Sequence, residues 1–215
     1  MIILKHYKEG DVSYVSHKDI LRVLQRGLKR AKVDVRYSQG YVPHMLTYTS
    51  TPVPLGVQSL AEYFAVDCTG IDEKELLKRY NASMPTGMRA VASFYKDKNP
   101  NLAAIVVASD YVATASEPLP QSIEEILKEE SIVIRSMKKG EAVQKEIRSL
   151  VFDVKVQGNK LFMRLASGNS NLRADDFVAH INAKYGCDIK TNDILRTAQL
   201  VSIAGNFVDV EEILK

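Results

Sequence analysis

The segment Ser16-His17-Lys18-Asp19 holds the residues best placed to do chemistry. It opens a predicted helix over residues 16–31, with Ser16 as N-cap and Asp19 three residues on, a variant of the capping box. His17 falls at the first helical position, where free N–H groups favour an anion and a neutral imidazole. Such a ring could accept a proton or donate to a phosphate. The simpler alternative is that these residues only cap the helix, since residues i and i+2 point apart and Asp19 cannot easily orient His17.

The same predicted helix carries a stripe of positive charge. At 100° per residue its cations fall on one arc, and the leucines fall on the opposite arc. The stripe is about 18 Å long at 1.5 Å per residue, enough to contact several phosphates of a nucleic acid. The alternative is an ordinary solvated face, although such faces usually mix both signs of charge and Asp19 is the one acid on this arc. The cations are Lys18, Arg22, Arg26, Lys29 and Arg30.

A long segment punctuated by glycine and proline follows, at residues 38–59. Connections of this length without regular structure usually have a function. Its first part offers flat aromatic faces for stacking on bases and a glycine that permits close backbone approach. Alternatively, the tyrosines pack as a lid over a sheet. The candidate binding residues here are Tyr37, Gln39, Gly40, Tyr41 and His44.

Two weaker candidates lie in the second half of the chain. Lys139 belongs to a short basic cluster that is diluted by glutamates and is as readily a solvated hairpin end. Arg173 ends a turn of small residues, 167–173, which could hold an anion or could simply precede a helix with Asn171 as its N-cap. His6 and His180 have no metal-ligand spacing, so we predict no metal site.

The elements that must position these residues alternate between short strands and helices. Residues 2–7, 33–37, 60–68 and 88–95 are predicted strands, with a short extension at 12–15, and helices are predicted over 16–31 and 72–84. This β-α-β-β-α-β order is typical of a ferredoxin-like unit. The second half repeats the order with one extra strand: strands at 104–113, 132–137, 151–156, 160–165 and 194–203, and helices at 122–130 and 173–185. We therefore predict an α+β protein of two tandem ferredoxin-like units, residues 1–98 and 99–215.

The composition excludes several classes of protein. Of 215 residues, 46% are hydrophobic and 26% charged, close to the average of globular domains. Two cysteines cannot build a zinc or iron–sulfur site, and no apolar run is long enough for a signal peptide or membrane span. A cytoplasmic location follows as the expectation. The net charge is only +3, but residues 1–58 hold 9 Lys and Arg against 4 Asp and Glu.

Three motifs in the first 63 residues together resemble the radical SAM-linked protein family, a domain of unknown function. The resemblance implies a chain fused to, or encoded beside, radical SAM proteins, often near genes for ribosomal proteins and ribonuclease G. The family tends to have Asn-Pro-Arg where this chain has Val42-Pro43-His44, so His44 would contact phosphate only when protonated. The motifs are Val15-Ser16-His17-x-Asp19-Ile20, Tyr37-Ser38-Gln39-Gly40-Tyr41-x-Pro43, and Pro52-x-Pro54-Leu55-Gly56-Val57-x-Ser59-x-Ala61-Glu62-Tyr63.

These observations predict an RNA-binding or RNA-presenting accessory module, acting on tRNA or rRNA, with a separate radical SAM protein as partner. No cofactor is expected, because the Cys-x₃-Cys-x₂-Cys site of radical chemistry is missing from this sequence. Two alternatives stay open: an RNA-acting enzyme that uses His17, and a protein-interaction adaptor that binds no nucleic acid. The sequence leaves the oligomeric state and catalysis undecided.

Overall fold

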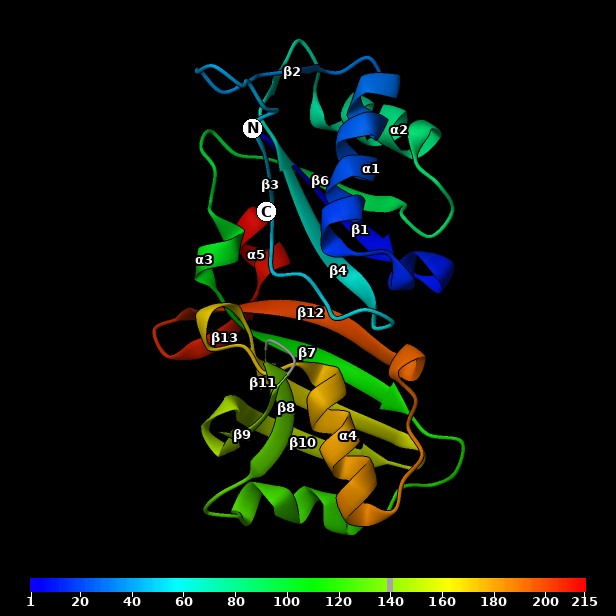
Figure 1. Ribbon diagram of the computed structural model, residues 1–215. Helices are drawn as coiled ribbons and strands as arrows, with labels where there is room; N and C mark the ends of the chain where they lie inside the picture. The colour runs from blue at the N-terminus through cyan, green and yellow to red at the C-terminus, as the bar shows by residue number, and fades with distance from the viewer. Residues whose placement is uncertain (139–140) are drawn as a thin grey trace.

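The computed structural model describes residues 1–138 and 141–215. Its first unit is an antiparallel sheet with α1 and α2 on one face (Figure 1). The strands lie in the order β3-β4-β1-β6, which is the strand order of a ferredoxin-like unit. The elements are β1 (Ile2–Lys8), α1 (His17–Arg30), β3 (Thr47–Thr49), β4 (Gln58–Val66), α2 (Glu73–Ser83) and β6 (Ala90–Tyr95), with the short η1 (Gly10–Tyr14), β2 (Asp34–Val35) and β5 (Cys68–Thr69) beside them.

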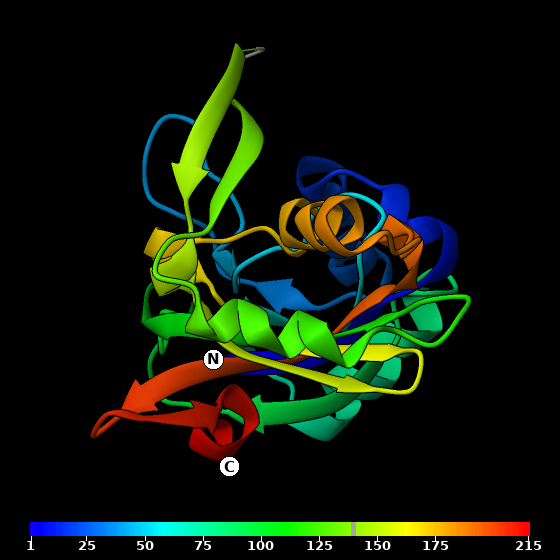
Figure 2. The ribbon, with the colours of Figure 1, turned by 90° about the horizontal axis from the view of Figure 1, so that it is seen from below.

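The second unit repeats this arrangement. Its strands lie in the order β10-β11-β7-β12, so the predicted α+β fold of two ferredoxin-like units is confirmed. The predicted extra strand is one half of a hairpin, β8 with β9, which stands away from the sheet (Figure 2). The elements are β7 (Val106–Thr114), η2 (Gln121–Lys128), β8 (Val133–Lys138), β9 (Glu141–Glu146), η3 (Arg148–Leu150), β10 (Val151–Gln157), β11 (Lys160–Ala166), η4 (Gly168–Ser170), α4 (Ala174–Tyr185), η5 (Thr191–Asp193) and β12 (Ile194–Ile203).

The two sheets join into one. β12 pairs in parallel with β4 over a short stretch, Leu195 beside Gln58 and Arg196 beside Ser59. After β12 the chain forms β13 (Asn206–Asp209) and α5 (Val210–Leu214), which with α3 (Leu102–Ile105) covers the other face of the first unit's sheet. The first unit is therefore covered on both faces, and we propose residues 1–98 and 99–215 as the division between the units.

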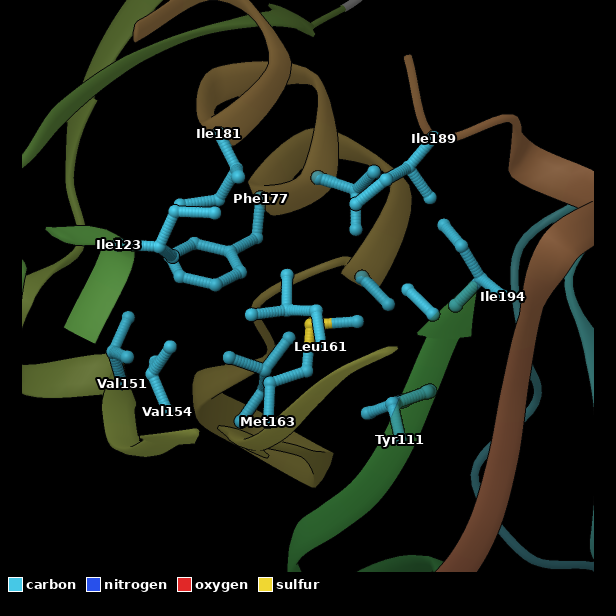
Figure 3. Close-up of a cluster of buried hydrophobic side chains, with 14 of the residues drawn as sticks. Tyr111, Ile123, Val151, Val154, Leu161, Met163, Phe177, Ile181, Ile189 and Ile194 are labelled. Carbon is cyan, nitrogen blue, oxygen red and sulfur yellow. The ribbon is translucent and has the colours of Figure 1, made fainter. Parts of the chain in front are cut away.

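Each unit has its own core between helices and sheet. The leucine arc predicted for the first helix packs as expected: Leu24 and Leu28 are fully buried against Leu4 and Phe64. In the second unit, α4 and η2 turn their apolar side chains onto β11, as Figure 3 shows for Phe177, Ile181, Ile123 and Leu161.

Several local predictions are wrong. The predicted strand at 12–15 is the 3₁₀ helix η1, and the strand at 33–37 shrinks to β2, which pairs with β5 outside the main sheet. Its place in the sheet is taken by β3, inside the segment expected to lack regular structure, where Thr47-Tyr48-Thr49 has β-branched and aromatic side chains that favour a strand. Asn171 does not cap α4, because the helix begins three residues later, after Arg173.

The turn before α4 lies close to the start of β7 at Gly168, and a substitution there tests this close contact. Its φ is +76°, and a Cβ would lie 2.4 Å from the carbonyl oxygen of Val106. Gly168→Ala is expected to lower the free energy of unfolding by at least about 2 kcal/mol, since strain and a backbone clash add. Gly158→Ala is the matched control, with φ of +61° but open space, and should lose about 1 kcal/mol. Equal losses in urea denaturation would contradict the predicted clash.

Candidate nucleic-acid interface

The start of α1 is a well-formed cap. The Ser16 Oγ accepts from the Asp19 backbone N–H at 3.2 Å and donates to the Asp19 carboxylate at 2.7 Å. The Arg22 guanidinium donates to the other carboxylate oxygen at 2.7 Å. The hydrogen bond from Ser16, followed by that from Arg22, lowers the pKa of Asp19. Asp19 is thus bound by the cap and by Arg22, and no hydrogen bond joins it to His17 among the described residues.

The basic stripe predicted from the sequence lies on the exposed side of α1. The five cations of the stripe differ in whether they form ion pairs or hydrogen bonds within the protein. Arg22 is held by Asp19, and Arg30 donates to the carbonyl of Ser83 at 2.6 Å, which ties α1 to the end of α2. The other three cations of the stripe, Lys18, Arg26 and Lys29, make no ion pair or hydrogen bond with residues 1–138 and 141–215.

The loop at residues 37–45 folds back on itself like a small hairpin. The Ser38 N–H donates to the His44 carbonyl at 2.9 Å, and Tyr37 and Met45 form an isolated bridge. The Ser38 hydroxyl lies 2.8 Å from the His44 Nδ1, which orients the ring. Gly40 has φ of +137°, so this turn needs a glycine at its tip.

The loop and α1 enclose a groove of about 320 Å³, called the α1 groove from here on. The structure thereby brings together two features that the sequence placed apart, namely three of the stripe's cations and two of the loop's candidates. Gln39, Gly40 and the fully exposed Tyr41 lie at the loop tip, outside the lining. The lining residues are Arg22, Gln25, Arg26, Lys29, Tyr37, Pro43, His44 and Met45.

The candidates of the second half do not join this groove. Arg173 is paired with Asp175 and lies 3.9 Å from Asp176, and the hydrogen bond that its guanidinium donates to Asp175 raises the pKa of Arg173. Lys145 donates to the carbonyl of Asn171 at 2.8 Å. Lys139 lies outside the described residues.

A second group of charged side chains, buried between the two units, was missed by the sequence analysis. Arg196 is 1% exposed. Its guanidinium is ion-paired with Glu62, donates from Nη1 to the Thr51 carbonyl at 2.8 Å and donates from Nε to the Ser59 hydroxyl at 3.2 Å. The available signal was a single charged residue within each of two mainly apolar strands, because charged residues are rarely buried unless they are paired.

Two basic side chains of β1 lie beside this pair. His6 is 2% exposed. Burial lowers the pKa of its ring, while Glu62 acts in the opposite direction. The pKa of Lys8 is also lowered, first by burial, and Glu62 again opposes the shift. His17 is exposed at the start of α1. Desolvation lowers the pKa of its ring, the charge of Glu62 acts in the opposite direction, and the charge of Lys8 makes a smaller contribution that lowers it.

Neither region offers a metal site. Across residues 1–138 and 141–215 no group of three His, Cys, Asp or Glu side chains is placed to hold a metal ion. Cys68 and Cys187 are free thiols, and burial raises the pKa of each. None of the helices in the same ranges is long and apolar enough to cross a membrane.

A bacterial protein family described as "Uncharacterized protein conserved in bacteria (DUF2344)" matches residues 2–174. The chain belongs to this family. The matched part of this DUF2344 member contains the whole α1 groove together with Lys8, His17 and Glu62, and it ends before β12 and Arg196. The finding establishes a conserved bacterial family and gives no link to radical SAM proteins.

Among solved structures, one similar chain comes from the crystal structure of a Cbf5-Nop10-Gar1 complex. It has 11% sequence identity and a TM-score of 0.41, over 92% of this chain and 48% of that chain. The DUF2344 member thus spans about half the length of that protein, and a similarity of this size carries no argument about function. A search of the curated proteins finds no match.

The buried pair of Arg196 and Glu62 gives a prediction for this family member. Arg196→Met leaves the Glu62 carboxylate buried without its partner, which typically costs about 3–5 kcal/mol of unfolding free energy. Arg79→Met is the control, because it removes an exposed arginine paired with Glu75 at 2.8 Å and should change stability by about 0.5 kcal/mol or less. If denaturant titrations gave equal losses for the two variants, the buried pair would not hold the units together.

Proposed function

We propose that this protein is an RNA-binding accessory module that holds a single RNA strand in the α1 groove. The observation that carries the proposal is the meeting of unpaired cations with an aromatic ring in one groove. Arg26 and Lys29 are exposed along one side, and Tyr37 and His44 line the other. Phosphates attract the cations, and a base can stack on a tyrosine whatever its sequence.

The helix also explains why the charge is available for a ligand. Its leucines are buried, so the opposite side must face solvent, and a solvated face would normally pair its cations with acids. On α1 the acid of the stripe, Asp19, is used by the cap and Arg22. Arg26 and Lys29 therefore line the groove without an acid partner among residues 1–138 and 141–215.

Two finer features of the proposal rest on the sequence resemblance. RNA, as tRNA or rRNA, is favoured over DNA, and a separate radical SAM enzyme is the proposed partner to which this module presents its RNA. The protein is proposed to act in the cytoplasm. We propose no reaction for it, since within residues 1–138 and 141–215 His17 makes no hydrogen bond to an acid that could orient its ring.

Replacing two cations of the α1 groove is the first test. For single strands, the logarithm of affinity falls with the logarithm of salt by about 0.7 per phosphate contact. Arg26→Ala/Lys29→Ala should therefore weaken binding and flatten the slope by about 1.4. The measurement is fluorescence anisotropy with a single-stranded RNA over a salt series.

Lys74→Ala/Lys78→Ala supplies the matched control for this test. It removes the same charge from exposed positions on α2, which does not line the α1 groove. The control should leave the slope close to that of the unaltered protein. The same loss of slope in both variants would mean that net charge, and not the groove, determines binding.

Tyr37 tests the stacking contact separately. Tyr37→Ala should cost about 1–3 kcal/mol of binding free energy, the usual size of a base–aromatic stack, without changing the salt slope. Tyr14→Ala removes another exposed tyrosine that lies outside the α1 groove and should bind RNA normally. Unchanged affinity in Tyr37→Ala would exclude stacking on this ring.

A further inference from the structure

The second unit's sheet has a face beside β11 that is open to solvent. On the other face, α4 and η2 pack onto the core side chains of β11, among them Leu161 and Met163 (Figure 3). Because side chains alternate along a strand, Phe162 lies on the opposite face. There Phe162 and Val112 of β7 are half-buried and Lys155 of β10 is exposed, so a ligand can reach this face.

A pocket of about 410 Å³ lies on this open face, within the size range of small-molecule sites, about 300–1,000 Å³. The strand register centres it on β11. Phe162 is opposite Lys155 on one side and opposite Val112 on the other, and all three line the pocket. The half-buried ring of Phe162 therefore offers an apolar surface inside the pocket, on which a flat ring can stack.

The charges of the pocket lining cancel. Arg164 donates from Nε to Asp110 at 2.7 Å and from Nη2 to the other carboxylate oxygen at 2.9 Å. The Lys155 Nζ lies 3.4 Å from the Asp153 carboxylate. These two cations and two acids are the charged residues of the lining. Unlike the α1 groove, the pocket has no excess positive charge to attract a polyanion, so its chemistry suits an uncharged ligand.

Hydrogen-bonding groups of both kinds remain available around the ring. The side-chain amide of Gln157 can donate and accept, and it makes no hydrogen bond with residues 1–138 and 141–215. The Asp153 carboxylate accepts from the Val154 N–H at 3.0 Å and keeps free lone pairs, since a carboxylate has about four. The Thr197 hydroxyl donates to the Asp110 carbonyl at 3.3 Å, so its oxygen can accept from a ligand. A matching ligand combines a flat apolar face with donors and acceptors at its edge.

We propose that this pocket binds an uncharged nucleoside, with its base stacked on Phe162 and the edge of the base hydrogen-bonded to Asp153 and Gln157. Nucleobases stack on aromatic side chains and form hydrogen bonds along their edges. The Asp153 carboxylate favours a base with an exocyclic amino group, such as adenine, because it accepts from that group. In uracil, two carbonyl oxygens flank the ring N–H and are repelled by a carboxylate. The pocket shares no lining residue with the α1 groove.

Adenosine and uridine are the probes, titrated separately into the unaltered protein and followed by two-dimensional NMR of its backbone amides. Adenosine should give saturable shifts at Lys155, Phe162 and Thr197. Its affinity should exceed that of uridine by at least about fivefold, the low end of discrimination between bases by a well-placed hydrogen bond. No saturable shift with adenosine, or equal affinities for the two nucleosides, would overturn the proposal.

Phe162 is tested by removing its ring and by a conservative replacement. Phe162→Ala should weaken adenosine binding about tenfold, as expected for the loss of one base–aromatic stack, and Phe162→Tyr should keep it. Phe152→Ala is the matched control, because Phe152 is an exposed phenylalanine on the neighbouring strand that lies outside the pocket lining. This control should bind adenosine normally. Equal losses in the two alanine variants would overturn the stacking contact.

Asp153→Asn tests the contact with the edge of the base. An amide donates as well as accepts, so this variant should bind uridine relatively better and bring the ratio of the two affinities to about one or below. The variant should fold, since the pair with Lys155 that it removes is exposed and adds little stability. An unchanged ratio would overturn the assigned base contact, even if Phe162→Ala fails to fold.

Ribose and single-stranded RNA are the alternative occupants. Ribose that shifts the same amides as strongly as adenosine would overturn the assignment to a base. An RNA strand that binds the pocket more tightly than adenosine would overturn the assignment to an uncharged nucleoside. Arg26→Ala/Lys29→Ala should keep the full adenosine response, because neither residue lines this pocket, and this separates the proposal from the proposed function.

Discussion

The ion pair between Arg196 and Glu62 is the interaction on which the arrangement of the two units depends. Parallel pairing between β12 and β4 covers only two residues on each strand, too little to hold two sheets in register. The Arg196 guanidinium extends from β12 into the first unit beside this short pairing. Its acceptors, Thr51, Ser59 and Glu62, all belong to the first unit. Nearby, the Gln199 amide donates to the Ala61 carbonyl at 2.6 Å and to the Ser50 hydroxyl at 2.8 Å. The contact between the two units is thus fixed by polar side chains of β12. Loss of these contacts would leave buried polar groups without hydrogen-bond partners.

Much of the first unit could be predicted from the sequence because its signals are local. The spacing of Leu24 and Leu28 and the cap at Ser16 predicted α1 within a residue at each end. The turn around Gly158 likewise predicted the hairpin of β10 and β11. By contrast, β3 has three residues and pairs with a strand that follows it at a distance, so its identity as a sheet strand comes from tertiary pairing.

For the candidate site too, some features could be predicted from the sequence and others could not. Periodicity alone assigned the cations of α1 to one face, but it could not show that Arg22 is engaged by Asp19 or that Arg30 is tied to Ser83. The contact of the loop with α1 depends on the fold-back through Ser38 and His44, which the composition of the loop does not specify.

These features make α1 the central element of the functional account: one side packs in the core and the other lines the α1 groove. A heteronuclear NMR titration with a short single-stranded RNA tests this most directly. The account predicts that chemical-shift changes concentrate at Arg26, Lys29, Tyr37 and His44. Changes confined to the second unit, or none at saturating RNA, would contradict it.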